Sequence, residues 1–196
     1  MGKLKGVLTT SDYLPMEEFI KLIDGLRKDK RHLWELYCCL SFCTAHRASD
    51  VLAYKWKDVL GKTDITKIER KTGKARTIQF NEEVRKKINE LYNLLGKPAP
   101  DQLMICNPKT KEAYTLRHIN RVLKTFRVEY RLPVKSFSTH TFRKTFGRHV
   151  YEHGGRTAES LILLSSIFKH SCIEMTKIYI GLQQTEIDNV FKSIKF

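Results

Sequence analysis

The stretch TDITKIERKTGKARTIQF, residues 63–80, decides the fold class of this chain. Residues 63–68 and 75–80 alternate polar and apolar side chains and are rich in β-branched residues, which is typical of strands that bury one face. KTGK, residues 71–74, lies between them and carries the glycine of a turn. We therefore predict a β-hairpin, and no other stretch indicates a sheet as clearly.

On both sides of this hairpin the hydrophobic period changes to that of helices. Pro15 opens an amphipathic stretch that continues to Leu26, and a second helix is expected from Leu33 to Phe42. After Ala45 we expect a turn and a short helix capped by Ser49 and Asp50. Further helices are expected over 82–95, over 115–131, and from 139 to the end. The predicted fold is mainly α with a small antiparallel β-sheet, an α+β class.

The helix expected at 115–131 has two stripes. The apolar stripe consists of Leu116, Ile119, Leu123, Phe126 and Tyr130. The basic stripe consists of Arg117, Arg121, Lys124 and Arg131. A basic stripe on one helix is often only a solvated face. However, residues 107–156 hold twelve Lys and Arg against three Asp and Glu, which favours a phosphate-binding surface.

The composition agrees with an anionic partner. The chain has 196 residues, a formal charge of +15 and a pI near 9.7, which favours nucleic acid or an anionic membrane surface. No apolar run approaches the roughly 18 residues of a membrane span, and the first ten residues lack the apolar core of a secretory signal. The five cysteines include no CxxC pair, so we expect reduced thiols in a cytosolic protein and no metal site.

The motif HTFR places His140 and Arg143 on one face at the start of a helix. A guanidinium that binds two oxygens beside an imidazole that moves a proton suits a phosphate. Further along, His170 and Tyr179 lie nine residues apart, with Thr176 between them. Each of these residues alone has an ordinary structural interpretation, as a packed aromatic or a hydrogen-bonded core histidine.

Two upstream residues complete an ordered set. Arg47 stands just before the short capped helix, and Lys71 lies in the hairpin turn. The order Arg, Lys, HxxR, His, Tyr over nearly the whole chain resembles the catalytic domain of the tyrosine recombinase (phage integrase) family. The resemblance implies a DNA strand-exchange enzyme and no metal or other cofactor.

The resemblance also implies a role for each residue. Tyr179 would be the nucleophile, and Arg47 and Arg143 would clamp the scissile phosphate. His140 would act as general acid and base, His170 would hydrogen-bond a phosphate oxygen, and Lys71 would protonate the leaving 5′-oxygen. We assign DNA contacts to the basic residues Arg117, Arg121, Lys124, Arg131 and Lys144.

These roles agree with elementary chemistry. A tyrosyl ester exchanges one phosphodiester for another, so neither ATP nor a redox cofactor is required. A phenol with a pKa near 10 is only about 0.1% ionised at pH 7. Guanidiniums that stabilise the developing charge supply the electrostatic help that the phenol needs.

The chain departs from the usual family pattern at four positions. Ala45 and His46 stand where a glycine and an apolar residue are usual before the first Arg. Lys144 replaces a frequent histidine, and Lys169 stands where glycine is common before His170. Lys74, three residues after Lys71, is an alternative for the catalytic lysine.

The family resemblance leads to further expectations. Residues 1–196 are expected to form a single catalytic domain, and the absence of a core-binding domain suggests a piece of a longer integrase. The expected partners are double-stranded DNA, other copies in a tetramer on DNA and accessory DNA-bending proteins, with no membrane. A C-terminal apolar stripe (Ile187, Val190, Phe191 and Ile194) is expected to dock on a neighbouring protomer. We expect a cytoplasmic protein of a bacterium, phage or mobile element that carries out DNA integration.

Two other functions fit parts of the sequence. His149, Glu152 and His153 match the HxxEH pattern of a zinc protease. A recombinase-like DNA-binding module without catalysis is the second alternative. The complete set of catalytic residue types disfavours both.

Overall fold

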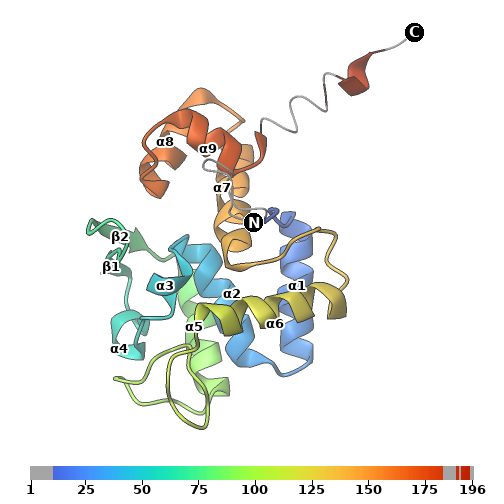
Figure 1. The fold of residues 1–196 in the computed structure, drawn as a ribbon. Helices are drawn as coiled ribbons and strands as arrows, with labels where there is room; N and C mark the ends of the chain where they lie inside the picture. Colours follow the sequence, from blue (N-terminus) through green and yellow to red (C-terminus); the bar gives the residue numbers. More distant parts are fainter. Residues whose placement is uncertain (1–10, 183–188, 190, 195–196) are drawn as a thin grey trace.

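The computed structural model describes residues 11–182, 189 and 191–194, and in this part of the chain one two-stranded sheet lies at the side of a group of helices (Figure 1). The predicted fold class is confirmed. The elements follow in the order α1 (Met16–Lys28), α2 (His32–Thr44), α3 (Ala48–Val51), α4 (Trp56–Val59), β1 (Asp64–Ile68), β2 (Ala75–Gln79), α5 (Glu82–Leu94), α6 (Leu116–Glu129), α7 (Thr139–His153), α8 (Ala158–Phe168) and α9 (Ile173–Tyr179).

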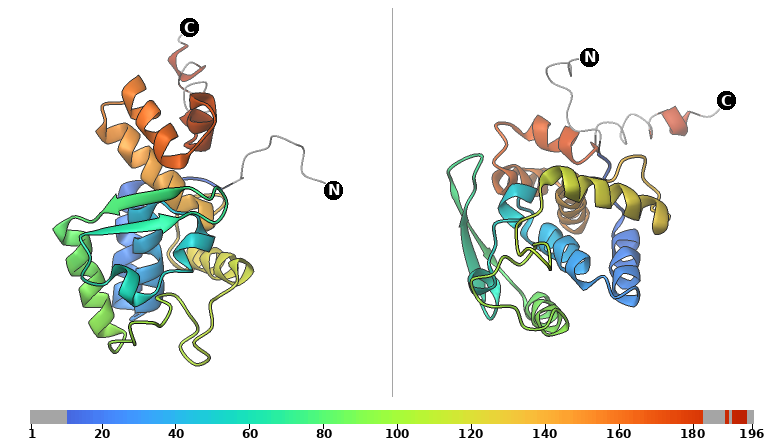
Figure 2. Two further views of the ribbon diagram at one scale, coloured as in Figure 1. Left: turned by 90° about the vertical axis from the view of Figure 1, so that its left-hand side faces the viewer. Right: turned by 60° about the horizontal axis from the view of Figure 1, so that its bottom comes forward.

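The structure confirms the predicted hairpin and gives its register. Ile65 pairs with Ile78 and Thr66 with Thr77 in antiparallel strands, and the two threonine hydroxyls lie 2.8 Å apart. Gly73 has φ +65° in the turn, a conformation in which glycine meets no Cβ clash. The hairpin lies at one side of the molecule, beside α3 (Figures 1 and 2).

Most helices pack into one body, which we call the main bundle: α1 to α6 with the first half of α7. Helix α2 is central and contacts α1, α3, α5 and α7. The buried side chains of the bundle form one continuous hydrophobic cluster that includes Leu22, Leu36, Leu123 and Phe142. Burial of the apolar stripes of these helices is the main stabilising contribution.

The second half of α7, with α8 and α9, forms a smaller body, which we call the C-terminal lobe. Its buried side chains, together with Ala45, which follows α2 in the main bundle, make a separate cluster: Tyr151, Leu161, Leu164, Phe168, Tyr179, Ile180 and Leu182. Helix α7 therefore belongs to both bodies and joins them (Figure 1). In the described residues, no helix has the length and apolar character that a membrane span needs.

Three local expectations were wrong. Ser49 and Asp50 do not cap α3, because Arg47 is the capping position and the buried Asp50 carboxylate instead accepts a hydrogen bond from the Arg70 amide at 3.0 Å. Leu116, assigned to the buried stripe of α6, is 46% exposed, because it is the first residue of the helix and extends beyond the packed face. The short helix α4 was not predicted.

Candidate active site

Arg143 lies where the main bundle meets the C-terminal lobe, and it is hydrogen-bonded to both. One terminal nitrogen donates to the Ala45 carbonyl at 2.7 Å and the other to the Phe168 carbonyl at 2.9 Å. Its guanidinium carbon also lies 4.4 Å from the centre of the Phe168 ring. Burial lowers the pKa of Arg143 to about 10, which still leaves the side chain charged at pH 7. Its position is therefore set by both bodies.

Arg47 is placed by the turn that ends α2. Ala45 adopts a left-handed conformation with φ 47°, and Arg47 then begins α3. Its guanidinium donates to the buried carboxylate of Glu69 at 2.8 Å. The same carboxylate accepts from the Thr72 hydroxyl at 3.1 Å. Glu69 thus connects Arg47 to the hairpin turn that carries Lys71.

Tyr179 is the last residue of α9 and is only 7% exposed. Its ring centre lies 5.4 Å from that of Phe168 and 5.3 Å from that of His170, both edge-on. Within the described residues, its buried hydroxyl lacks a well-oriented hydrogen-bond partner. Burial raises the pKa of Tyr179, while the positive charges of Arg143 and Arg47 partly oppose this shift. The phenol is therefore neutral at rest and lies beside two cations.

His170 follows the end of α8. Its Nδ1 lies 2.9 Å from the Thr176 hydroxyl. Burial, together with the charges of Arg143 and Arg47, lowers the pKa of His170 to about 4. The ring is therefore neutral at pH 7 and can donate a hydrogen bond from the nitrogen that carries the proton.

The structure thus brings Arg47, Arg143, His170 and Tyr179 together. It places the other two predicted catalytic residues, His140 and Lys71, at exposed positions. His140 lies exposed in the first turn of α7, on the same side of this helix as Arg143. Lys71 is exposed in the hairpin turn.

The alternative lysine, Lys74, has a different setting. Together with His170, it lines a cavity of about 470 Å³, and Lys71 is not among the described residues that line it.

A buried network behind the site was not predicted. Arg76 donates to the carbonyls of Thr44 at 2.7 Å and Ile167 at 3.0 Å, and to Nε2 of His46 at 3.2 Å. Burial and the charge of Arg76 lower the pKa of His46 to about 3. Since Nε2 accepts from Arg76, the neutral ring carries its proton on Nδ1 and donates to the Tyr54 oxygen 2.9 Å away. His46 stands where the family usually has an apolar residue, and both of its ring nitrogens are hydrogen-bonded.

One residue that contacts the site, Glu69, could have been identified from the sequence. β1 ends at Ile68, and a strand period of two continued by one residue places Glu69 on the same side as Ile65 and Lys67. Because Ile65 faces the core, Glu69 also faces inward and needs a cationic partner. The partner itself, Arg47, lies 22 residues earlier and could not be identified from local pattern.

The residues assigned to DNA contact lie in different settings. Arg117, Arg121 and Lys124 are exposed and line one hollow of about 610 Å³ on α6. Arg131 is exposed beyond the end of that helix and is not among the described lining residues.

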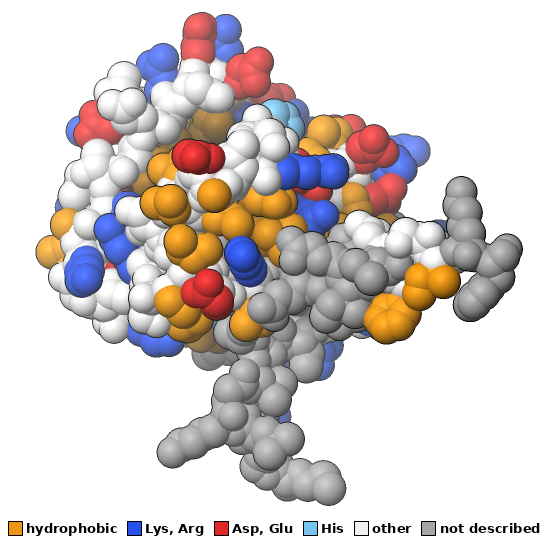
Figure 3. Space-filling model, turned by 90° about the horizontal axis from the view of Figure 1, so that it is seen from above, with side chains coloured by type: hydrophobic (Ala, Val, Ile, Leu, Met, Phe, Trp, Pro, Cys, Tyr) orange, Lys and Arg blue, Asp and Glu red, His pale blue; other side chains and the backbone are white. Residues whose placement is uncertain are grey.

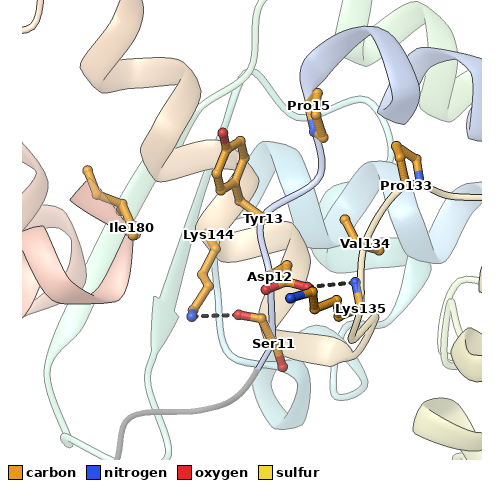
Figure 4. Close-up of a pocket in the computed structure, with 10 residues that line it drawn as sticks. Ser11, Asp12, Tyr13, Pro15, Pro133, Val134, Lys135, Lys144 and Ile180 are labelled. Carbon is orange, nitrogen blue, oxygen red and sulfur yellow. Dashed lines mark hydrogen bonds between the residues drawn. The ribbon is translucent and has the colours of Figure 1, made fainter. Parts of the chain in front are cut away.

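The assignment of Lys144 to the DNA surface does not match its position and must be corrected. Lys144 is 7% exposed, and its amine donates to the Ser11 carbonyl at 2.6 Å (Figure 4). The same amine lies 5.4 Å from the centre of the Tyr179 ring. Lys144 therefore contacts the Tyr179 ring and the Ser11 backbone instead of the solvent.

The HxxEH residues serve packing and surface contacts. Glu152 pairs with Arg148 at 2.7 Å, and the His149 ring packs against Phe42 at 5.9 Å between centres. The described residues contain no cluster of three metal-ligating side chains. Nothing in this geometry favours the zinc protease alternative.

The fold and the site together define a class. A mainly helical fold with one hairpin places two arginines and a histidine around a buried tyrosine, an arrangement that suits the stabilisation of negative charge on a phosphate. Sequence comparison agrees: the phage integrase family matches residues 12–186, and the chain belongs to this family of tyrosine-type site-specific recombinases. Its reaction is therefore site-specific DNA recombination, and its partner is DNA.

Two relatives illustrate the similarity. The chain is 29% identical over 149 residues to the probable integrase/recombinase YoeC of Bacillus subtilis (strain 168), which covers 76% of this chain and 77% of that protein. It is 28% identical over 177 residues to the integrase of Escherichia phage P2, which covers 90% of this chain but 45% of that protein. The chain thus spans less than half of the phage P2 integrase.

Solved structures share the fold at lower identity. XerA recombinase superposes with a TM-score of 0.71 at 20% identity, covering 97% of this chain and 68% of that one. The integrase of transposon Tn1549 in complex with transposon right end DNA gives 0.69 at 14% identity, covering 96% and 68%. A lambda integrase(75-356) dimer bound to a COC′ core site gives 0.66 at 17% identity, covering 90% and 61%.

Proposed function

We propose that this chain cleaves and rejoins DNA through a 3′-phosphotyrosyl intermediate at Tyr179. The tyrosine oxygen attacks the scissile phosphorus, the bond from phosphorus to the 5′-oxygen breaks, and the 5′-hydroxyl leaves with a proton. The 5′-hydroxyl of another strand then reverses the step and releases the tyrosine. The observation that carries the proposal is the buried Tyr179 hydroxyl beside Arg143 and His170.

We assign each predicted catalytic residue one role in this reaction. Arg47 and Arg143 stabilise the charge that develops on the pentacoordinate phosphate, and the neutral His170 donates a hydrogen bond to a phosphate oxygen. His140, at the exposed start of α7, accepts the proton of Tyr179. Lys71 protonates the leaving 5′-oxygen, which is the proton that balances the step.

We propose that the basic face of α6 binds the duplex on either side of the cleaved bond. Arg117, Arg121 and Lys124 share one hollow on the surface, and their side chains reach phosphates without the need for base recognition. Binding should weaken steeply with salt, because each neutralised phosphate contributes about −0.9 to the log–log slope.

We further propose that the chain acts as the catalytic domain of a longer integrase that forms a tetramer on DNA, assisted by DNA-bending proteins in the cytoplasm of a bacterium. Exposed hydrophobic side chains on α8 and α9 support contacts with other copies: Ile162, Leu163, Met175 and Ile178. Figure 3 shows hydrophobic side chains gathered on this face of the molecule.

The C-terminal stripe is described only in part. Ile187 and Val190 lie outside the described residues. Phe191 and Ile194 are 69% and 53% exposed, which supports docking of this segment on a neighbouring protomer.

A nicked DNA substrate that traps the covalent intermediate tests the proposed reaction. The protein should form an adduct that survives a denaturing gel. Arg143→Lys should lose the adduct, because an ammonium cannot bind two phosphate oxygens as a planar fork. His140→Ala should slow its formation by about 10²–10⁴. Failure to form an adduct with the element's own end sequences would favour the non-catalytic DNA-binding module.

A further inference from the structure

Lys169 ends α8 in a conformation that suits glycine. It has φ 55° and ψ 42°, in the left-handed region where a Cβ crowds the backbone. Its amide donates to the Ser166 carbonyl at 3.2 Å, and the next amide, that of His170, donates to the Ser165 carbonyl at 3.0 Å. The turn therefore needs the backbone conformation but not the lysine side chain.

Lys169 lines a hollow beside the active site. This cavity of about 470 Å³ is lined by Lys74 and Lys169, by His170, by Ser165, Ser166 and Ser171, and by Ile162 and Ile173. None of the described residues that line it is acidic. Two ammonium groups and several hydroxyls around one hollow are donors that suit a phosphate group.

The two lysines come from separate segments that are fastened together. Lys74 directly precedes β2, and Lys169 directly follows α8. Arg76, two residues after Lys74, donates to the Ile167 carbonyl at the end of α8 at 3.0 Å. This bond holds the start of β2 against the end of α8, so the cavity is part of the folded structure.

We propose that Lys74 and Lys169 bind the DNA phosphate next to the scissile one. The inference rests on the proposed function, in which His170 contacts the scissile phosphate, because His170 is the wall that the cavity shares with the active site. The neighbouring phosphate of the same strand lies one nucleotide away. Binding of this neighbouring phosphate by the two lysines would position the strand at Tyr179. Lys71 would remain the residue that protonates the leaving 5′-oxygen.

The first test separates side-chain charge from backbone strain. Lys169→Gly should raise Tm, because it removes the left-handed strain, and should also weaken binding to a labelled duplex. The log–log salt slope should become shallower by about 0.9, the value for one lost phosphate contact. Lys169→Arg should keep the slope of the wild-type protein.

Lys30 offers a matched control. It is also an exposed lysine with φ 55° after a helix, but it lies in the α1–α2 turn, at the opposite end of the molecule from α8 and α9 (Figure 1). Lys30→Gly should raise Tm without a change in the salt slope. A Lys169→Gly slope equal to that of the wild-type protein would overturn the proposal.

The second test uses a nicked substrate in which sulfur replaces the bridging 5′-oxygen. A thiol has a pKa of about 8.5, so it leaves as a thiolate without a proton donor. This substrate should restore cleavage by Lys71→Ala but not by Lys74→Gln or Lys169→Gly. Rescue of Lys74→Gln would mean that Lys74 is the acid, and the proposed phosphate contact would be wrong for that residue.

If the proposed function itself were wrong, the adduct assay would show it independently of the salt slopes. If Tyr179→Phe still formed an adduct on the oxygen substrate, the proposed nucleophile would be wrong, whatever the salt slopes showed. If wild-type adduct forms and both lysine variants keep the wild-type slope, only the second phosphate contact is refuted.

Discussion

The main bundle and the C-terminal lobe contribute different parts of one site. The bundle supplies Arg47 and the hairpin, supported by 26 buried hydrophobic residues among those described. The lobe supplies His170 and Tyr179 from a cluster of eight. Arg143, on the helix that both bodies share, hydrogen-bonds to a carbonyl of each.

The two bodies differ in how firmly they hold their parts of the site. Arg47, one of the two arginines proposed to clamp the phosphate, belongs to the body with the large core, whereas the proposed nucleophile, Tyr179, ends a helix of seven residues. Such a short helix is unstable by itself and depends on its tertiary contacts. A small cluster opens at lower free energy than a large one. We therefore expect Tyr179 to change position more readily than the two arginines.

The largest effect is expected from removing the Tyr179 oxygen, the atom of the lobe that would bond to the phosphorus. Tyr179→Phe should abolish the covalent adduct, while Tm and DNA affinity stay nearly unchanged, because only a buried hydroxyl is removed. The measurement is the adduct band on a denaturing gel. Tyr151→Phe, in the same cluster, is the matched control and should keep the band; a band that persists in Tyr179→Phe would identify another nucleophile.

Equivalent clashes in the two bodies should separate stability from activity. A Cβ on Gly147 would lie 2.7 Å from the Ile180 side chain and 3.0 Å from the Phe168 ring, whereas one on Gly25 would lie 2.7 Å from the Tyr130 ring. Both alanine variants should lose about 1–3 kcal/mol of stability. Gly147→Ala should also slow cleavage by about 10²-fold, because it displaces the segment that carries Tyr179.

Urea unfolding and adduct kinetics on both proteins would check this. Gly25→Ala should cleave within a few-fold of the wild-type rate. If cleavage slows equally in Gly25→Ala and Gly147→Ala, the rate depends on the stability of the whole protein. The C-terminal lobe would then not be the more easily displaced body.

Glu69→Gln tests how the bundle holds its arginine. Loss of the carboxylate leaves the Arg47 guanidinium without its ion pair and should cost about 1–3 kcal/mol of stability. DNA should bind more tightly, because a negative charge near the phosphate is removed, while cleavage slows by roughly tenfold if Arg47 loses its orientation. Fluorescence titration and single-turnover cleavage separate these effects.

Glu82→Gln is the control for a surface pair. Glu82 and Lys86 lie 2.8 Å apart and are both exposed, so this change should alter stability by less than about 0.5 kcal/mol. If Glu69→Gln behaves like Glu82→Gln, the Arg47–Glu69 pair has no role in orientation.

The smallest effect concerns pH. The folded-state pKa values of His46, about 3, and His170, about 4, lie below the unfolded value of about 6.5. Their contributions to stability are therefore complete above pH 6.5 and are lost as the pH falls toward the folded values. Each buried histidine that must take up a proton adds about 1.4 kcal/mol per pH unit to the slope.

Urea midpoints at pH 7, 6, 5 and 4.5 would measure this slope. His46→Phe should flatten it more than His170→Asn, because His46 is fully enclosed by the bundle network and His170 is half-buried at the lobe. An unchanged slope in His46→Phe would show that His46 is not the residue that titrates.

Periodicity and composition determined much of this protein without a structure. The period of two at 63–80 predicted the hairpin, and the helical period predicted α1, α2, α5 and α6 within a residue or two. These features depend on interactions between near neighbours in sequence, so a local pattern records them. The ordered set Arg47, His140, Arg143, His170 and Tyr179 was also visible as residue types at family spacing.

Tertiary structure alone decided which side chains meet. Arg47 meets Glu69 and Arg76 meets Ile167 across 22 and 91 residues, and Lys144 turns inward to Ser11 over 133. The left-handed turns at Ala45 and Lys169 show why glycine is usual there, although their residue types indicate nothing of the kind. Burial and long-range pairing arise only when the two bodies pack on α7, and the local sequence of each partner holds no record of the other.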